Sequence, residues 1–404
     1  MKTNYDYIVL GCGGIGSAAL YWLGRRTGGE VLGIEQFKLF HGNGGSQDYS
    51  RIIRHYYHKD CYARLTPYTY AAWETVRQES GVQVVTKTGG VVIAYAGSPQ
   101  QATVERYADS LAAINSDPNF TGNIEYEWLD NAELAYRFPQ FRPERPVKVC
   151  YQKDTGIADP TRGNAAHIAL ARGYGATILA ECAVLNVQPV SVQRQGDGVV
   201  VQTSQGTFTC RRLVIAAGAW SNQALASLGF QIPVRVSQEQ VTYFATPHLK
   251  EFAIGNFPVF QWKTDYSYYG FPVYGEVATK AAIDDIGETV TATTRSFTPN
   301  QTREAQLDSW LAEHIPHLIG PKLYTKTCLY TMPPDRDFVL DSLPEQPNIF
   351  VAIGAGHAYK FASFLGQVLS ELAIDGQTRH DISAFTTRRP AIMNPQAGVS
   401  YQYR

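Results

Sequence analysis

Two short apolar segments near the N-terminus flank one segment with helical periodicity. Residues 5–10 (YDYIVL) and 30–35 (EVLGIE) have the length and apolar content of buried strands. Between them, residues 14–25 place their apolar side chains on one face of a helix: Ile15, Ala18, Ala19, Trp22 and Leu23. This order predicts a βαβ unit, and therefore parallel strands in a doubly wound α/β sheet.

Strand-like patterns continue along the chain and are broken by Gly, Pro and Asp: residues 90–97, 148–160 and 176–190. Residues 161–173 have the pattern of a helix, and alternation over 198–210 predicts a hairpin that turns at residues 205–206. Residues 213–222 and 348–373 each join an apolar strand to a glycine turn, and the second of them continues as an amphipathic helix. Tyr- and Phe-rich strands dominate a second lobe, where they build either a pocket wall or, more commonly, a core.

Charge and cysteine content exclude several classes of function. The 404-residue chain is 44% hydrophobic, which predicts a globular protein with a sizeable core. It has 35 Lys and Arg against 36 Asp and Glu, so no excess positive charge is available for nucleic acid or an anionic membrane. Six cysteines, at 12, 61, 150, 182, 210 and 328, show no CxxC pair and no metal-ligand spacing. We therefore expect neither a metal site nor a disulfide framework.

The apolar segment 7–23 resembles a targeting signal at first sight. Asp6 precedes it, four glycines interrupt it, and it is too short to span a bilayer comfortably. The C-terminal SYQYR is not a peroxisomal SKL-type address. These features predict a cytoplasmic protein in a reducing compartment.

A glycine motif lies between the first strand and the first helix. Gly11, Gly13 and Gly16 form G-x-G-x-x-G, and Glu35 ends the next strand. Glycines permit a tight turn and close approach of a pyrophosphate, the helix N-terminus supplies N–H donors, and the acid accepts ribose hydroxyls. The motif predicts a dinucleotide site. Its alternative is a glycine turn required only for helix packing.

FAD fits the remaining pattern better than NAD. The strand–glycine segments 213–222 and 348–373 are typical of FAD-binding proteins with two dinucleotide-binding domains. A helix N-terminus beside a flavin would stabilise the negative charge of the reduced ring. A NAD-linked dehydrogenase remains possible from the first βαβ unit alone.

Five ordered motifs resemble the monomeric sarcosine oxidase family, with N-methyltryptophan and pipecolate oxidases as members. They are GCGGIG, SRIIRHYY (50–57), YYGFPVYGEVATK (268–280), KTCLYTMPPDRDF (326–338) and GHAYKF (356–361). The resemblance runs from about residue 5 to 385. It implies a monomer with a Rossmann-like FAD-binding domain interleaved with a mixed-sheet substrate domain. It also implies that Cys328 carries FAD as a thioether, whereas Cys12 is a packing residue.

The domain bounds follow from these segments. We predict that residues 1–89, 146–222 and 326–390 form the FAD-binding domain. The substrate domain takes residues 90–145 and 223–325.

The resemblance also assigns roles to individual side chains. Arg54 and Lys360 are expected to clamp the substrate carboxylate, which suits a fork of donors and a point charge. Lys280 is similar to the family lysine that promotes reaction with O2, and Arg51 is expected near the flavin face. The remaining pocket residues are Tyr269, Tyr330 and His357, of which His357 is equally well explained as a structural histidine. Alone, each of these cations could be an ordinary solvated residue.

Further cofactor contacts are expected along the same segments. The full predicted set is Gly11, Gly13, Gly14, Gly16, Glu35, Gln36, Ser46, Ser50, Arg51, Val184, Gly218, Cys328, Gly354, Gly356 and Lys360.

Three positions depart from the family pattern. Gln47 and Asp48 stand where relatives commonly have His-Gly, which changes the charge near the flavin. Asp284 stands where sarcosine oxidases tend to have histidine, so a different substrate pocket is expected.

We therefore expect an FAD-dependent oxidase that converts the C–N bond of a secondary amino acid, N-methyl or cyclic, to an imine and reduces O2 to H2O2. One alternative is a flavin amino-acid dehydrogenase of the same fold with a different electron acceptor. Another is a non-enzymatic dinucleotide-binding protein, which would have no need for Cys328, Lys280, Arg54 and Lys360 together.

Overall fold

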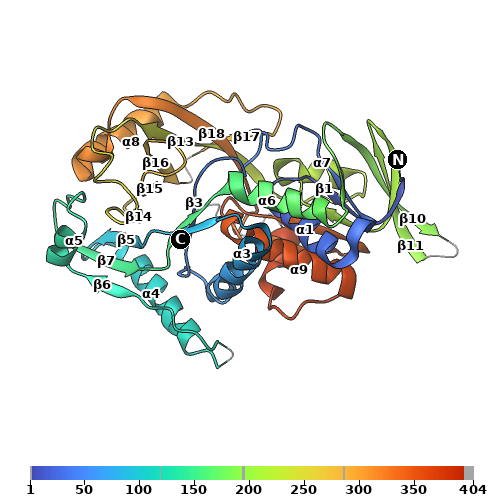
Figure 1. Ribbon diagram of the computed structural model, residues 1–404, viewed down its shortest axis with the longest axis horizontal. Helices are drawn as coiled ribbons and strands as arrows, with labels where there is room; N and C mark the ends of the chain where they lie inside the picture. The colour runs from blue at the N-terminus through green and yellow to red at the C-terminus, as the bar shows by residue number, and fades with distance from the viewer. Residues whose placement is uncertain (1, 119, 193–195, 285–286, 395–404) are drawn as a thin grey trace.

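The structure, a computed structural model, describes residues 2–118, 120–192, 196–284 and 287–394. Two lobes lie side by side along the long axis of the molecule (Figure 1). One lobe contains the N-terminal strand and the long helices near it, and the other contains most of the strands between residues 90 and 330. The predicted α/β architecture is confirmed.

The first lobe is built on an eight-stranded sheet in the described residues. Its parallel part has the order β9-β2-β1-β12-β20. The bounds are Thr177–Leu179 (β9), Val31–Ile34 (β2), Asn4–Leu10 (β1), Gly206–Ile215 (β12) and Gln346–Ile353 (β20). Antiparallel strands extend it: β10 (Val184–Val192), β11 (Gly196–Thr203) and β19 (Val339–Leu343). Because parallel strands end at one edge, the chain following β1, β2, β12 and β20 gathers at that edge.

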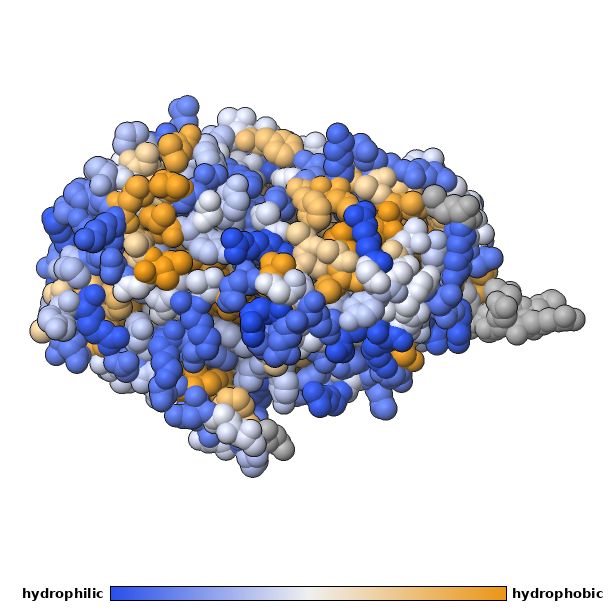
Figure 2. Space-filling view, in the orientation of Figure 1, coloured by the Kyte–Doolittle hydropathy of each residue, from blue (hydrophilic) through white to orange (hydrophobic). Residues whose placement is uncertain are grey.

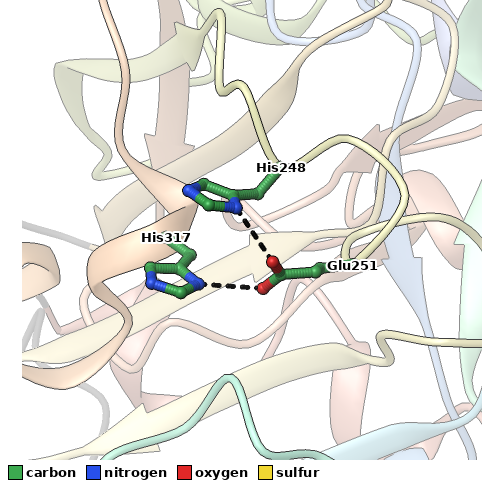
Figure 3. Close-up of side chains that lie close together, drawn as sticks. All are labelled: His248, Glu251 and His317. Carbon is green, nitrogen blue, oxygen red and sulfur yellow. Dashed lines mark hydrogen bonds and ion pairs between the residues drawn. The ribbon is translucent and has the colours of Figure 1, made fainter.

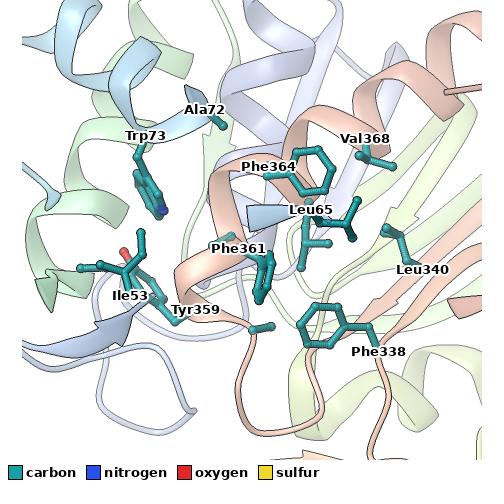
Figure 4. Packing of buried hydrophobic residues seen from close by; sticks show 14 of the residues in the cluster. Ile53, Leu65, Ala72, Trp73, Phe338, Leu340, Tyr359, Phe361, Phe364 and Val368 are labelled. Atoms are coloured by element: carbon teal, nitrogen blue, oxygen red, sulfur yellow. The ribbon is translucent and has the colours of Figure 1, made fainter. Parts of the chain in front are cut away.

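Four helices pack together, and two of them, α1 (Gly14–Thr27) and α9 (Ala362–Asp375), contact this sheet. Helix α1 contacts both α9 and α6 (Pro160–Gly173), and α3 (Thr66–Ser80) packs on α9. A Cβ atom on Gly366 would lie 2.5 Å from the Ala18 carbonyl carbon, so glycine permits the close approach of α9 to α1. Figure 4 shows the buried side chains between α3, α9 and neighbouring strands, including Trp73, Phe361 and Phe364.

The second lobe is built on a nine-stranded mixed sheet in the described residues. Its order is β17-β13-β16-β15-β14-β5-β7-β6, and β18 pairs with β13. The bounds are Glu288–Val290 (β17), Arg235–Phe244 (β13), Thr279–Asp284 (β16), Ser267–Phe271 (β15), Val259–Lys263 (β14), Gly90–Tyr95 (β5), Val147–Gln152 (β7), Glu127–Leu129 (β6) and Lys322–Met332 (β18). Helices α4 (Gln101–Asn115), α5 (Asn131–Arg137) and α8 (Gln301–His314) belong to the same lobe.

A small antiparallel sheet and short helices complete the described structure. The sheet consists of β3 (Arg51–Ile53), β8 (Gly156–Ala158) and β4 (Val85–Lys87). The short helices are α2 (Asp60–Ala63), α7 (Ser221–Ala226) and α10 (Pro390–Met393), with 3-10 turns at Gly28–Glu30, Gly218–Trp220, Pro316–Leu318, Tyr359–Phe361 and Ser383–Phe385.

Most predicted elements are confirmed with small shifts, including the first βαβ unit, helix 161–173 and the hairpin turn at residues 205–206. The expected breaks within two strand-like segments are also present. The segment 148–160 divides into β7 and β8, and 176–190 divides into β9 and β10 at a turn where Glu181 adopts a positive φ of 54°. The sequence prediction missed α3, α4 and α8, although α4 has helical spacing at Val104, Tyr107, Leu111 and Ile114.

The predicted domain bounds cut across one sheet. Strands β7 and β18 lie wholly or partly in segments predicted to belong to the FAD-binding domain, yet both pair within the nine-stranded sheet. The division into two domains stays a prediction, and sheet pairing places these two strands with the second lobe.

No helix in the described part of the chain is both long enough and apolar enough to cross a membrane. On the viewed face, hydrophobic side chains form separate groups among hydrophilic ones (Figure 2).

Candidate functional site

A cleft lies between the two lobes and is lined by residues of both. Residues that follow β1, β2, β12 and β20 line one end of it, and residues of β14, β15, β16 and β18 line the other end. The parallel strand ends are the usual ligand site of a doubly wound sheet. The cleft is therefore a single site with contributions from both sheets.

The glycine motif shapes the first end of the cleft. Gly11 has φ +87°, and a Cβ atom there would lie 2.7 Å from the Ala216 carbonyl oxygen. A Cβ on Gly16 would lie 1.8 Å from the Gly11 carbonyl oxygen. Helix α1 begins at Gly14, and no described side chain caps it. Its first N–H groups are thus available to an anion in the cleft.

Glu35 lies at the end of β2 beside this loop. Its carboxylate accepts hydrogen bonds from the backbone N–H groups of Cys12 (2.9 Å) and Phe37 (3.0 Å) and faces His41. Burial opposes the charged form, but His41 and the two N–H groups outweigh burial and hold the pKa of Glu35 below its usual value. Glu35 is therefore an ionised acceptor at the rim of the cleft.

Strand register builds the wall at the other end. Lys263 of β14 pairs with Ser267 of β15, and Ser267 pairs with Asp284 of β16. Two residues further along the strands, Gln261 of β14 pairs with Tyr269 of β15. Two residues beyond Tyr269, Phe271 of β15 pairs with Lys280 of β16. Side chains two residues apart share a face, so these rows present one polar and aromatic surface to the cleft.

A buried charge cluster surrounds Lys280. Its Nζ atom lies 2.6 Å from Asp48 Oδ2 and also donates to Ser50, and both charged side chains are 3% exposed. Arg51 and the Tyr243 hydroxyl bind the same carboxylate at 3.0 and 2.6 Å. Lys326 Nζ lies 4.0 Å from Asp48 Oδ1, so three cations of the described structure share the charge of this carboxylate.

The pKa values of this cluster follow from burial and from the shared carboxylate. Burial lowers the pKa of Lys280 to about 8, even though Asp48 raises it. Burial opposes ionisation of Asp48, but Lys280 and then Arg51 outweigh burial and lower the pKa of Asp48. Asp48 thus stays ionised, whereas Lys280 titrates near physiological pH.

Arg54 and Lys360 form a second cationic group. The Arg54 guanidinium carbon lies 4.9 Å from the Tyr57 ring centroid, and Lys360 Nζ lies 5.6 Å from the same centroid. Lys360 also donates to the His357 carbonyl oxygen at 2.9 Å. Burial, and next the charge of Arg54, lower the pKa of Lys360 well below its usual value. An incoming carboxylate would reverse this effect and favour the charged lysine.

His357 both lines the cleft and packs against the protein. Its ring stacks on Phe338 at 4.7 Å, and Nε2 lies 3.2 Å from the Arg336 carbonyl oxygen. Burial, and next Lys360, lower the pKa of His357 well below its usual value. His357 is therefore neutral, and its Nε2–H group is the donor. Its surroundings fit both roles expected from the sequence, a pocket residue and a structural histidine.

Cys328 lies on β18, directly before the cleft-lining Leu329. It pairs with Glu239 of β13, and the next residues, Leu329 and Tyr330, line the cleft. Burial raises the pKa of the Cys328 thiol. The positive charge of the nearby Arg51 opposes this rise. The thiol itself is not among the cleft-lining groups of the described residues.

The structure brings nearly all predicted site residues together. Those that line the cleft are Gly11, Gly13, Gly14, Glu35, Gln36, Ser46, Ser50, Arg51, Arg54, Val184, Gly218, Tyr269, Lys280, Tyr330, Gly354, Gly356, His357 and Lys360. Gly16 and Cys328 adjoin the lining. The roles assigned to these residues stay predictions.

A family model described as FAD dependent oxidoreductase matches residues 6–372. The chain belongs to this family. It is 34% identical to the monomeric sarcosine oxidase of Streptomyces avermitilis over 97% of this chain and 99% of that protein. It is 27% identical to the N-methyl-L-tryptophan oxidase of Yersinia pestis over 96% and 99%. The resemblance found in the sequence is therefore confirmed.

A solved structure shows the same fold. NikD, an amino acid oxidase essential for nikkomycin biosynthesis, superimposes in its open form with a TM-score of 0.80 over 95% of this chain and 98% of that chain, at 24% identity.

The cleft of this FAD-dependent oxidoreductase fits its cofactor. The uncapped start of α1 offers N–H donors to a pyrophosphate, and Glu35 offers an ionised acceptor to a ribose. Phe37 and Trp220, with ring centroids 5.4 Å apart, supply aromatic faces near that end. The predicted FAD site thus contains the donor and acceptor types that a dinucleotide needs.

Several cleft residues were missed by sequence reasoning. His41, Trp220, Gln261 and Lys263 all line the cleft. The alternation in the segment that became β14 gave a signal for Lys263, because Val259, Gln261 and Lys263 share a face. Sequence alone could not tell whether that face met solvent or a cleft.

One group with metal-ligand composition lies outside the cleft lining. Among the described residues, His248, Glu251 and His317 could offer three ligand atoms within 4.8 Å of one another. Figure 3 shows the carboxylate bridging the two rings, and the Nδ1 atoms lie 2.8 and 2.9 Å from its oxygens. The rings stack with 7° between their planes and 4.1 Å between their centroids, so the lone pairs of the two imidazoles lie in separate, nearly parallel planes. The group is best described as a carboxylate hydrogen-bonded to two imidazoles.

Proposed function

We propose that this FAD-dependent oxidoreductase oxidises the C–N bond of a secondary amino acid, N-methyl or cyclic, to an imine, with O2 reduced to H2O2. One observation carries the proposal. The same cleft has a dinucleotide-type glycine loop at one end and two adjacent buried cations, Arg54 and Lys360, at the other. The names of the relatives, sarcosine oxidase and N-methyl-L-tryptophan oxidase, agree with an amino acid substrate.

When bound, FAD supplies a two-electron acceptor for the substrate C–H bond. The residues of the chain provide binding, orientation and charge. Arg54 binds the α-carboxylate as a fork of donors, and Lys360 adds a point charge from the same side. Tyr269 and Tyr330 border the substrate and exclude water. The neutral amine is the reactive form, because an ammonium has no lone pair to assist C–H cleavage.

We propose that Cys328 carries FAD through a thioether. Support comes from its position on β18, directly before the cleft-lining Leu329, and from the nearby Arg51 charge, which partly offsets the rise that burial causes in the pKa of the thiol. Acid precipitation of the purified protein tests the linkage. Colour should stay with the precipitated chain in the wild type and move to the supernatant in Cys328→Ser. Colour that leaves the wild-type chain would contradict the linkage without affecting FAD binding.

The Asp48–Lys280 ion pair favours a second candidate, a dehydrogenase that passes electrons to an acceptor other than oxygen. Lys280 is the cation expected to promote the oxygen reaction. A carboxylate 2.6 Å away cancels part of its field. Peroxide yield per substrate, measured with and without an artificial electron acceptor, separates the two. A yield near one peroxide per substrate supports the oxidase, and a rate that requires the acceptor supports the dehydrogenase.

Arg54→Met tests the carboxylate clamp. A charged hydrogen bond contributes about 1.5–3 kcal/mol, so KM for an N-methyl amino acid should rise by about tenfold to a hundredfold. Arg106→Met is the matched control, because Arg106 is exposed on α4. An unchanged KM in Arg54→Met would contradict the clamp. The monomeric state and cytoplasmic location stay predictions.

A further inference from the structure

Among the described residues, three tyrosine rings lie against the guanidinium group of Arg54. The guanidinium carbon lies 4.9 Å from the ring centroid of Tyr57, 5.0 Å from that of Tyr56 and 5.4 Å from that of Tyr107. All three rings are fully buried, and the Tyr56 and Tyr107 rings stack with their centroids 5.3 Å apart. A cation within about 6 Å of an aromatic centroid is attracted to the electron-rich face of the ring. The three rings therefore restrict where the guanidinium group can lie.

Tyr107 differs from the other two tyrosines in its origin. Tyr56 and Tyr57 belong to the same segment as Arg54, whereas Tyr107 lies on α4 in the second lobe. Helix α4 packs on β5 and β7 of the second sheet. One helical turn beyond Tyr107, Ser110 Oγ accepts a hydrogen bond from the Tyr57 backbone N–H group at 3.2 Å. Tyr107 and Ser110 thus connect the Arg54 segment to the second lobe.

The Tyr107 ring also lies near Lys263, the last residue of β14. Lys263 Nζ donates to Ser267 Oγ at 2.8 Å and lies 6.0 Å from the Tyr107 centroid. Burial raises the pKa of Tyr107, but Lys263 and then Arg54 outweigh burial and lower it. The charges of both cations therefore reach this ring. Attraction to one shared ring offsets part of the repulsion between two like charges at the same end of the cleft.

A guanidinium group binds a carboxylate strongly only in a restricted orientation. Two parallel N–H donors must point at the two carboxylate oxygens. An arginine that is free to rotate loses side-chain entropy when it binds, and this loss weakens the interaction. Contact with three buried rings orders Arg54 before any ligand arrives, so less entropy is lost on binding.

We propose that Tyr107 is a positioning residue for substrate binding, because its ring holds Arg54 in the orientation that binds the substrate α-carboxylate. The inference rests on the proposed function, in which Arg54 is the carboxylate clamp. Tyr107 acts through Arg54, since the described lining of the cleft includes Arg54 and not Tyr107. Helix α4 thereby takes part in substrate binding without contacting the substrate.

Binding of matched ligands to the oxidised holoprotein tests the inference without turnover. Cyclopentanecarboxylate and cyclopentanecarboxamide both have the shape of a cyclic amino acid, and only the first is charged. By isothermal titration calorimetry, the wild type should bind the carboxylate about tenfold or more tightly than the amide. Pentafluorophenylalanine at position 107 keeps the shape of the ring and removes its electron-rich face, so this preference should fall about threefold or more. Tyr107→Phe, which keeps the electron-rich face, should retain the wild-type preference.

A second pair of variants separates positioning from a merely structural role. Tyr107→Leu removes the ring and should lower the carboxylate preference as pentafluorophenylalanine does. Leu111→Ala is the matched control, because Leu111 is fully buried one turn further along α4. The cavity in Leu111→Ala should lower the melting temperature and leave the preference unchanged. A preference that survives in Tyr107→Leu and with pentafluorophenylalanine would overturn the inference. A loss that already occurs in Tyr107→Phe would assign the effect to the hydroxyl group and would also overturn it.

Arg54→Met separates a failure of this inference from a failure of the carboxylate clamp. The preference should be lost in Arg54→Met, and Tyr107→Leu added to that variant should cause no further loss, because Tyr107 acts through Arg54. A further loss of the same size would overturn the inference and leave the clamp intact. A preference that survives in Arg54→Met would contradict both.

Kinetics connects the inference to the proposed reaction. For an N-methyl amino acid, Tyr107→Leu should raise KM about threefold or more, with a smaller effect on kcat. A fall in kcat with KM unchanged would contradict positioning of the carboxylate clamp. Oxidation of no secondary amino acid by the wild type would contradict the proposed function, and the carboxylate titration would still decide the inference.

Discussion

Replacing Asp48 by Asn should move the titration of Lys280. The wild-type pKa of Lys280 is about 8, so the lysine is mostly charged at pH 7 and loses its charge as the pH rises through 8. Breaking a buried ion pair costs about 3–5 kcal/mol. The lower value of this range, taken as the stabilisation of the charged lysine by Asp48, corresponds to a shift of about two pKa units. The pKa of Lys280 in Asp48→Asn should therefore fall to about 6. The variant lysine would be mostly neutral at pH 7.

The rate of oxygen reaction with the substrate-reduced protein reports this change. Stopped-flow traces between pH 5 and 10 should show a wild-type rate that falls with a midpoint near pH 8. In Asp48→Asn the midpoint should move to about pH 6, with a faster rate below it because the opposing carboxylate is gone. Lys280→Met should abolish the step. Asp284→Asn, which removes another cleft carboxylate, should leave the midpoint near 8. A midpoint unchanged in Asp48→Asn would show that Asp48 does not raise the pKa of Lys280.

Two further predictions concern the nucleotide end of the cleft. In Gly16→Ala the added Cβ would lie 1.8 Å from the Gly11 carbonyl oxygen. This clash should lower the free energy of unfolding by about 1–3 kcal/mol, so the flavin content and the melting temperature should both fall. Gly42→Ala, where a Cβ meets nothing within 4 Å, should melt like the wild type, and equal losses in both variants would contradict the packing argument. Glu35→Gln, made in a Cys328→Ser background so that FAD can dissociate, should bind FAD about tenfold or more weakly by fluorescence titration. Unchanged affinity would show that the Glu35 carboxylate is not a ribose acceptor.

The parts of the site that sequence predicted are those encoded in one continuous segment. The Gly11–Gly16 loop and Glu35 belong to one βαβ unit, whose strands and helix follow from local periodicity. Arg54 and Lys360 were predicted as site residues because each belongs to a short continuous motif, SRIIRHYY and GHAYKF. Such features need no knowledge of tertiary packing.

The parts that sequence could not predict depend on contacts between distant segments. Asp48 is recognisable as an unusual residue in its loop, but its pairing with Lys280 joins residues 232 positions apart. Lys263 has an alternating strand pattern, and only the second sheet shows which of its two faces meets the cleft. The extension of β18 into the nine-stranded sheet likewise depends on pairing with β13, which no local pattern specifies.

Anaerobic titration of the purified protein with secondary amino acids tests the central claim most directly. Without oxygen, a substrate that the cleft oxidises leaves its electrons on the flavin, so the yellow absorbance should bleach in proportion to the amount added. At least one N-methyl or cyclic amino acid should bleach the flavin, and the colour should return when an electron acceptor is admitted. A flavin that stays yellow with every secondary amino acid, although artificial reductants bleach it, would show that the cleft does not oxidise secondary amino acids.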